Sequence, residues 1–325
     1  MRILGIGNAL VDVLIRLDND NILNELELPK GSMQLIDQTK REKIFRAVDG
    51  FGISLASGGS VSNTILALSK MGVDSGFIGK VGNDEYGNFY VKEIEDAGVT
   101  PHFSQENAPS GTAMTLITPD GERTFGTYLG AAAGLQANEI LNQTFLPYGI
   151  FYVEGYLVNN YELIESAMKM AKEKSLLIAI DLASYNVVEE NKESFLHLIR
   201  EYVDIVFANE EEARALTGKD PDEAVKVLAS ETQIAIVKIG AEGSYVMQGD
   251  TLVKVPAIKT QMIDATAAGD FYAAGFFYGM IHKAGLEQCG RIGSLLASNV
   301  IRVVGTKLSE DTWEKIRSGA AGILN

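Results

Sequence analysis

The sequence predicts an α/β protein whose core is a mostly parallel β-sheet flanked by helices. From about residue 150 onward, short apolar runs alternate with segments of helical periodicity. This order is typical of a parallel sheet covered on both faces, because each parallel crossover needs room for a helix. Apolar residues make up 46% of the chain, which is enough for a sizeable core. Two stretches of alternating apolar residues lie outside this order and predict a smaller β-structure.

The expected strands are short apolar runs, and the expected helices repeat apolar residues at helical spacing. Gly98 and Gly218 mark two helix ends, because glycine commonly follows the last helical turn. The expected strands are 3–6, 76–79, 150–153, 176–181, 205–208 and 234–239. The expected helices are 60–71, 85–97, 162–174, 192–202, 210–216, 222–229 and the Gly- and Ala-rich segment 268–281. Ligands of such sheets usually bind at the carboxyl ends of the strands.

Residues of about 9–37 and 105–130 predict a small β-sheet that could act as a lid. The first range begins with alternating apolar residues, and the second contains two alternating runs around the turn Pro119-Asp120-Gly121. Two such runs around a tight turn are typical of a β-hairpin. No linker or internal repeat divides the chain. We therefore expect a single domain over 1–325 that carries this lid.

Charge and composition exclude several classes of function. The formal net charge of −15 argues against nucleic acid as the main partner, because phosphate backbones are bound by Lys and Arg. The single cysteine, Cys289, rules out an intrachain disulfide, and we expect it to be a buried structural thiol. No apolar run reaches the length of a membrane span, and the N-terminus does not read as a signal peptide. We expect a cytoplasmic protein without nucleic-acid or membrane partners.

The segment Asp264-Ala-Thr-Ala-Ala-Gly-Asp270 is the strongest candidate for chemistry. A loop of small residues runs directly into the apolar helix 268–281. The first N–H groups of a helix lack internal partners and attract anions, and small side chains let an anion approach them. A carboxylate there would repel a phosphate, unless it serves as a base for a substrate hydroxyl. The residues are equally compatible with Asp270 merely capping the helix.

Two glycine-containing segments supply further candidate residues. In Gly58-Gly-Ser-Val-Ser-Asn63, the glycine backbone could approach a pair of ligand hydroxyls that Asn63 binds. An ordinary capped helix start would explain the same residues. Asn8 and Asp12 follow the first strand and could contact substrate hydroxyls. The segment around them lacks the third glycine of a dinucleotide-binding loop, and no phosphate-binding P-loop motif is present. The scattered histidines make a site with protein-only metal ligands improbable.

Taken together, these segments resemble the ribokinase-like carbohydrate kinase family, also called the PfkB family. The resemblance extends over nearly the whole chain and implies a three-layer fold with a mostly parallel central sheet and a small β-sheet lid. The segments that carry it are, in chain order, Gly7-Asn8 with Asp12, Gly58-Gly59-Ser60 with Asn63, Phe77 to Gly87, Asn209-Glu-Glu-Glu212, Lys238 to Ser244, and Asp264 to Asp270. Only the last is specific alone, but six in the family's order leave little room for chance.

The resemblance also implies a role for each candidate residue, with ATP and Mg²⁺ as required partners. Asp270 would take the proton from a substrate hydroxymethyl group, and the backbone of Ala267, Ala268 and Gly269 would stabilise the transferring phosphoryl group. Glu212 would act on Mg²⁺ through water, and Asp264 would lie near a monovalent-cation site such as one for K⁺. The implied substrate residues are Asn8, Asp12, Gly58, Gly59, Ser60, Asn63 and Arg123, and the implied nucleotide residues are Asn209, Glu212, Lys238, Gly240 and Gly243.

One position departs from the family's pattern. The family usually has Gly-Ala-Gly-Asp, whereas Ala267 stands here in place of the first glycine. If this position requires a positive φ, alanine costs about 1 kcal/mol or more. If φ is negative, nothing is lost, because only the backbone N–H is used.

The family includes kinases of nucleosides and of sugars. Gly58 to Asn63, Gly7-Asn8, Gly-Glu-Arg123, Lys30 to Met33 and Tyr152 to Tyr156 look more like the adenosine kinase branch. We therefore expect a purine nucleoside, adenosine first, and next a sugar or sugar phosphate. A nucleoside-binding sensor that has lost catalysis is the alternative from another class, and Ala267 is its only support. A homodimer is compatible with the family, because lid strands can pair between subunits.

Overall fold

The computed structural model describes residues 1–325 and contains a nine-stranded main sheet. From β12 to β6 every neighbouring pair of strands is parallel, and β13 and β14 add an antiparallel edge. The order across the sheet is β14 (Thr251–Val255), β13 (Ser244–Gln248), β12 (Ile234–Lys238), β11 (Ile205–Asn209), β10 (Leu177–Asp181), β9 (Ile150–Glu154), β1 (Ile3–Ile6), β5 (Ser75–Gly82) and β6 (Thr100–Glu106). The expected α/β class with a mostly parallel sheet is confirmed.

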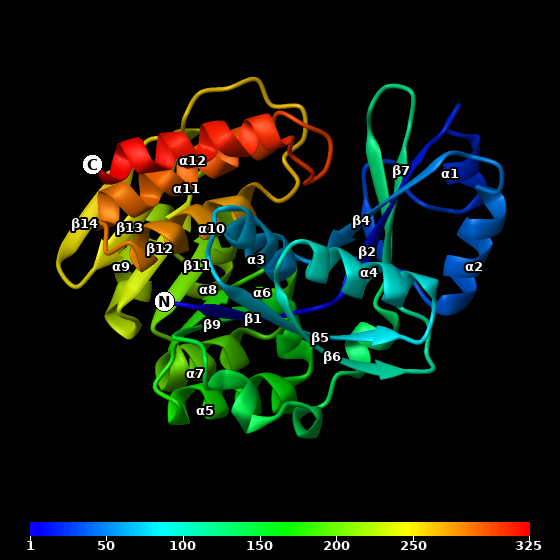
Figure 1. The fold of residues 1–325 in the computed structure, drawn as a ribbon. Helices are drawn as coiled ribbons and strands as arrows, with labels where there is room; N and C mark the ends of the chain where they lie inside the picture. Colours follow the sequence, from blue (N-terminus) through cyan, green and yellow to red (C-terminus); the bar gives the residue numbers. More distant parts are fainter.

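Helices cover both faces of this sheet and make a three-layer molecule (Figure 1). Successive strand residues point to opposite faces, so Ile3 belongs to one buried apolar cluster and Leu4 to the other. One layer consists of α3 (Ser60–Lys70), α4 (Glu85–Asp96), α10 (Ala268–Ile281), α11 (Leu286–Val300) and α12 (Glu310–Leu324). The other consists of α5 (Tyr161–Glu173), α7 (Lys192–Tyr202), α8 (Glu210–Thr217) and α9 (Pro221–Glu231), with the short α6 (Tyr185–Glu190) beside them. No helix is long and apolar enough to cross a membrane.

A second, five-stranded sheet stands beside the main one, at the upper right of Figure 1. Its β7–β8 hairpin turns at Pro119-Asp120-Gly121, where Gly121 has a φ of 87°. The hairpin expected within 105–130 is therefore confirmed. The strand order is β3 (Met33–Leu35), β8 (Arg123–Tyr128), β7 (Gly111–Ile117), β2 (Leu10–Arg16) and β4 (Ile53–Gly58), and α1 (Asn21–Glu25) and α2 (Gln38–Ala47) lie in the same part of the chain.

The carboxyl ends of five adjacent parallel strands collect the residues that matter for the site. β1 leads into Gly7-Asn8, and the other four strands end in Glu154, Asp181, Asn209 and Lys238. The helices α3 and α10 begin close to this edge and contact each other. Parallel topology thus places polar groups from distant parts of the sequence at one edge of the sheet.

Candidate active site

Asp270 lies in the first turn of α10 and is held by two side chains of α3. Ser60 Oγ donates to Asp270 Oδ1 at 2.8 Å, and Asn63 Nδ2 donates to Oδ2 at 2.8 Å. Thr64 Oγ1 donates to the backbone carbonyl of Asp270 at 3.0 Å. The side chain does not cap its own helix, because Ala267 is the N-cap residue and makes no side-chain cap. The capping alternative considered for this carboxylate is therefore wrong.

Burial makes Asp270 a stronger base than an ordinary aspartate. Burial raises its pKa to about 6, although the hydrogen bonds from Asn63 and Ser60 favour the charged form. The carboxylate is thus mainly ionised at neutral pH and still able to accept a proton.

Asp12 of β2 lies near Asp270, on the side of the second sheet. Burial, and next the charge of Asp270, raise the pKa of Asp12 to about 7, while the Arg123 guanidinium opposes this rise. Glycines allow the close approach of the backbone here. A Cβ on Gly58 would lie 2.4 Å from Asp12 Oδ1, and one on Gly59, whose φ is 99°, would lie 2.4 Å from the Asn8 carbonyl oxygen.

Glu154, at the end of β9, organises the residues that follow β1. Its Oε1 accepts from Asn8 Nδ2 at 2.7 Å and from Asn8 N at 3.2 Å, and its Oε2 accepts from Val61 N at 3.4 Å. Burial raises the pKa of Glu154 to about 7 against the effect of the Asn8 bonds. Gly7 leaves space for this carboxylate, because a Cβ there would lie 2.5 Å from Oε2. Sequence reasoning did not include Glu154 among the site residues.

Arg123 connects the second sheet to the loop before α10. Its Nη1 lies 2.6 Å from Asp264 Oδ2 and donates to Thr266 Oγ1 at 3.2 Å. Asp264 also accepts from Gly305 N at 2.7 Å and from Thr266 N at 3.0 Å. Burial alone would raise the pKa of Asp264, but these donors outweigh it and hold the pKa below its usual value. Both oxygens of Asp264 therefore have partners from the protein.

Ala267 adopts the left-handed conformation, with φ 59° and ψ 11°. The departure from glycine thus falls at a position that requires a positive φ. The Ala268 N–H donates to the Ala265 carbonyl at 3.2 Å, whereas the N–H groups of Ala267, Gly269 and Asp270 make no hydrogen bond within the protein. An anion at this helix start would thus find free donors on Ala267, Gly269 and Asp270, but not on Ala268.

Lys238 places an ammonium group beside the start of α10. Its Nζ lies 3.0 Å from Asp181 Oδ2 and 3.0 Å from where a Cβ on Gly269 would stand. Burial lowers the pKa of Lys238, but the charges of Asp181 and Glu212 outweigh it and raise the pKa overall. Lys238 stays protonated at neutral pH and faces the helix start with its charge.

Asn209 and Glu212 form a reciprocal capping box at the start of α8. Glu212 N donates to Asn209 Oδ1 at 2.8 Å, while Asn209 N and Nδ2 donate to the Glu212 carboxylate at 2.8 and 2.6 Å. Burial and the charge of Asp181 raise the pKa of Glu212 to about 7, and Lys238 opposes this. The Asn-x-x-Glu segment therefore has a structural role in addition to any role with a metal.

A cavity of about 660 Å³ opens next to Lys238. This volume is in the range of small-molecule sites. Gly240 and Gly243 line it with positive φ values of 54° and 104°, and a Cβ on Gly243 would lie 1.9 Å from the Val255 carbonyl oxygen. The remaining wall includes Gly269, Tyr272 and a set of small and apolar residues, namely Ala241, Ala257, Ile258, Met262, Ala265, Ala268, Ala297 and Ile301.

The structure thus brings most of the predicted residues to one place. Ser60, Asn63 and Asp270 are in direct contact, and Lys238, Gly240 and Gly243 line a single cavity. Glu154 and Asp181, which the sequence reasoning missed, could have been found from their position as the last residue of a buried strand. No group of three or more His, Cys, Asp or Glu side chains is arranged to hold a metal ion.

The chain is similar to proteins of one family throughout its length. Residues 32–313 match the pfkB family carbohydrate kinases. An adenosine kinase from Sinorhizobium meliloti is 34% identical in sequence to this chain, and its solved structure matches with a TM-score of 0.87 over 98% of each chain. That of a probable sugar kinase from Rhizobium etli CFN 42 is 31% identical, with a TM-score of 0.88 over 99% of this chain and 98% of the other. A 5-dehydro-2-deoxygluconokinase from Halalkalibacterium halodurans is 29% identical over 263 residues, which cover 75% of this chain and 79% of that enzyme. The chain therefore belongs to the pfkB family of carbohydrate kinases, which are phosphotransferases that act on hydroxyl groups.

Proposed function

We propose that this kinase phosphorylates the hydroxymethyl group of a purine nucleoside, with adenosine as the first candidate, and uses ATP as the donor. The observation that carries the proposal is the buried Asp270 carboxylate, held by Ser60 and Asn63 at the helix start beside Lys238. Two observations support a nucleoside as the substrate. Several segments of this chain resemble the adenosine kinase branch of the family, and the chain is similar to the Sinorhizobium meliloti adenosine kinase.

In this proposal Asp270 accepts the proton of the substrate hydroxyl as that oxygen attacks the γ-phosphorus of ATP. The bond from phosphorus to the bridging oxygen breaks, and ADP leaves. Free N–H groups of Ala267 and Gly269 and the Lys238 ammonium would stabilise the charge on the transferring group. Asn8, Asp12, Gly58, Gly59 and Asn63 would hold substrate hydroxyls. The 660 Å³ cavity would hold the nucleotide.

The second sheet would act as a lid in this proposal. Arg123 reaches from β8 to Asp264 and Thr266, so the sheet already contacts the loop that starts α10. Exclusion of water by this contact would prevent loss of the phosphoryl group by hydrolysis.

Magnesium fits this arrangement as an ion carried by the nucleotide. Glu212 is a buried carboxylate near Lys238 and Asp181, but its oxygens already accept hydrogen bonds from Asn209, so it would act through water. When bound, Mg²⁺ supplies positive charge that neutralises the phosphate oxygens. A monovalent cation near Asp264 stays a prediction. Because both Asp264 oxygens have protein partners, such an ion would need additional ligands.

A sugar or sugar-phosphate kinase is the second candidate. The observation that favours it is the similarity to a probable sugar kinase and to a 5-dehydro-2-deoxygluconokinase. The polar groups that would bind a ribose, among them Asn8, Asp12 and Asn63, would equally bind the hydroxyls of a free sugar. A nucleoside differs from a free sugar in carrying a base, and a sugar phosphate differs from both in carrying a phosphate group.

A coupled assay of ADP release with a panel of nucleosides and sugars tests the proposal. We expect release with adenosine and none above background with ribose, fructose or 5-dehydro-2-deoxygluconate. ADP release with a sugar but not with a nucleoside would reject the nucleoside proposal and support a sugar kinase. Tight nucleoside binding by calorimetry without any ADP release would identify a sensor and reject the kinase proposal for this chain.

A further inference from the structure

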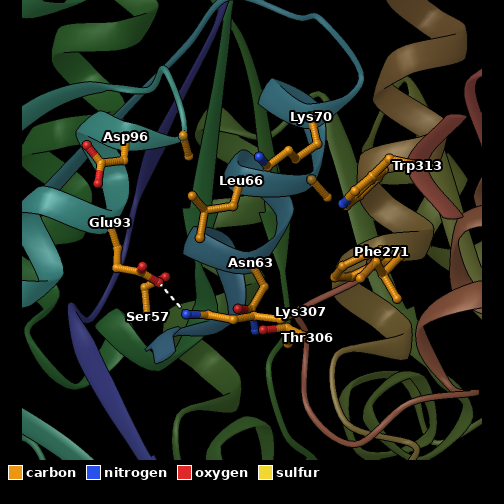
Figure 2. Close-up of a pocket in the computed structure, with 13 residues that line it drawn as sticks. Ser57, Asn63, Leu66, Lys70, Glu93, Asp96, Phe271, Thr306, Lys307 and Trp313 are labelled. Atoms are coloured by element: carbon orange, nitrogen blue, oxygen red, sulfur yellow. Dashed lines mark ion pairs between the residues drawn. The ribbon is translucent and has the colours of Figure 1, made fainter. Parts of the chain in front are cut away.

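Asn63 also lines a second cleft, of about 300 Å³ (Figure 2). This cleft shares no lining residue with the cavity beside Lys238. It runs along α3 and is enclosed by α4, α10, α12 and the segment Thr306–Leu308. Of the residues proposed above for the substrate or the nucleotide, only Asn63 lines it. Its apolar floor includes Leu66 and the stacked rings of Phe271 and Trp313, whose centroids lie 5.8 Å apart.

Three polar groups on this cleft lack partners of their own. Asn63 is only 7% exposed, and its Oδ1 makes no hydrogen bond. Trp313 is 4% exposed; its indole N–H makes no hydrogen bond, and Figure 2 shows the ring nitrogen turned toward the cleft. Lys70 forms no ion pair, and Figure 2 shows its ammonium extending over Leu66. A buried acceptor is costly unless a donor meets it.

The other charges on the rim already have partners. Lys307 pairs with Glu93 at 2.8 Å, and Asp96 pairs with Lys92 at 2.5 Å. The cleft therefore offers one free ammonium and one indole donor, an apolar floor, and one buried carbonyl acceptor. An anionic group would meet Lys70 and the indole, and a hydroxyl or amino group would meet Asn63.

We propose that this cleft binds a small organic anion with an apolar body and a hydroxyl or amino donor, and that its occupancy acts on the catalytic carboxylate through Asn63. The coupling rests on the proposed function, whereas the binding does not. Asn63 Nδ2 donates to Asp270, and Phe271 directly follows Asp270 in α10. A donor on Asn63 Oδ1 would fix the amide in the orientation that donates to Asp270.

The probe 4-hydroxybenzoate carries the anion, the flat apolar body and the donor in one molecule. Trp313 is the only tryptophan in the chain, so its fluorescence reports binding without any catalytic assay. We expect a saturable change, with benzoate at least about fivefold weaker because it cannot donate to Asn63. The full chain with Lys70→Met should bind the probe at least about fivefold more weakly, because the anion loses its cation. Lys315→Met, on the exposed side of the same helix as Trp313, should bind like the parent.

Turnover measured with the ATP and acceptor of the assay above should change at least about twofold at saturating probe. Lys70→Met should keep its basal turnover and lose this response. No saturable fluorescence change, or equal binding of benzoate, would overturn the binding site. Displacement of the probe by the acceptor substrate would place it in the substrate site instead and would also overturn the proposal. Saturable binding with unchanged turnover would overturn the coupling through Asn63.

Discussion

At the scale of single residues, Asp270, the proposed proton acceptor, is held by two side chains. Ser60 and Asn63 each donate to one oxygen of Asp270, and hydrogen bonds to the charged form of an acid lower its pKa. Burial acts in the opposite direction and prevails, which leaves the pKa at about 6. The activity should therefore fall as the pH drops through about 6, because a protonated Asp270 cannot accept the substrate proton.

Ser60→Ala removes one of these two donors and should raise the pKa of Asp270 further. The acidic limb of the pH profile of kcat/KM should then move upward by about one pH unit, since a hydrogen bond to a charged group contributes about 1.5 kcal/mol or more. Ser69→Ala provides a matched control, because this hydroxyl of the same helix donates to the Ala97 carbonyl. An unmoved limb in Ser60→Ala would show that another group controls the profile.

Asp270→Asn keeps the shape of the side chain and removes the base. A positioned base contributes about 10²–10⁴-fold, so kcat should fall at least about 10²-fold. Circular dichroism and the thermal midpoint should show a folded protein, because an amide can still accept from Ser60 or Asn63. Turnover within a few-fold of the parent would remove Asp270 from the role of base.

Ala267→Gly relieves a strained backbone position. An L-residue in the left-handed region costs about 1–2 kcal/mol, while glycine loses about 0.4–1 kcal/mol more chain entropy on folding. With φ at 59°, we expect the free energy of unfolding to rise by about 0.5–1 kcal/mol. Denaturant titration measures this difference. A less stable glycine variant would mean that the alanine methyl contributes packing that outweighs the strain.

Residue-level prediction from the sequence succeeded where a motif is contiguous. Ser60 and Asn63 lie three residues apart, and one turn of α3 brings both to Asp270. Glu154 and Asp181 have no neighbouring motif, because their partners are 146 and 57 residues away. Only the pairing of the strands places these two carboxylates against Asn8 and Lys238.

At the scale of elements, Arg123 connects the second sheet to the loop before α10. Arg123→Gln removes the guanidinium from the buried Asp264, whose side chain is only 5% exposed. Loss of one partner of a buried ion pair is costly, about 3–5 kcal/mol. Amide hydrogens of β7 and β8 should therefore exchange at least about tenfold faster in this variant.

Arg16→Gln is the control for that experiment, because Arg16 ends the neighbouring strand β2 and is exposed. It should leave the exchange of β7 and β8 unchanged. Equal exchange in Arg123→Gln and the parent would show that the second sheet is held by its apolar contacts alone.

Many elements with a buried face were predicted, but the helices α2, α11 and α12, which also bury residues, were missed. The helix 268–281 has the predicted bounds, because glycine and apolar residues make up all of it apart from Asp270. The strands β4 and β6 were missed because half of the residues of β4 and all of those of β6 are partly or fully exposed, so no apolar run marks them. The antiparallel edge of β13 and β14 was missed for a related reason, since β14 has a single fully buried residue, Val255.

At the scale of the whole molecule, the site concentrates acids in a protein that is already acidic. Asp12, Glu154 and Asp270 lie on the side proposed for the substrate, and Asp181 and Glu212 lie on the side proposed for the nucleotide. Against them stand only two cations, Lys238 and Arg123. The net charge of −15 adds a long-range repulsion for any polyanion that approaches.

This balance predicts how ionic strength affects the two substrates. Salt screens charges beyond about 8 Å at 0.15 M but only beyond about 30 Å at 0.01 M, so it weakens the long-range repulsion more than the contact with Lys238. The KM for ATP should therefore fall by about twofold between these salt concentrations, while the KM for uncharged adenosine should stay constant. Steady-state kinetics at fixed free Mg²⁺ and constant pH measure both. A KM for ATP that rises with salt would mean that the local pair of cations, rather than the overall charge, controls nucleotide binding, and Lys238→Met should then abolish that rise.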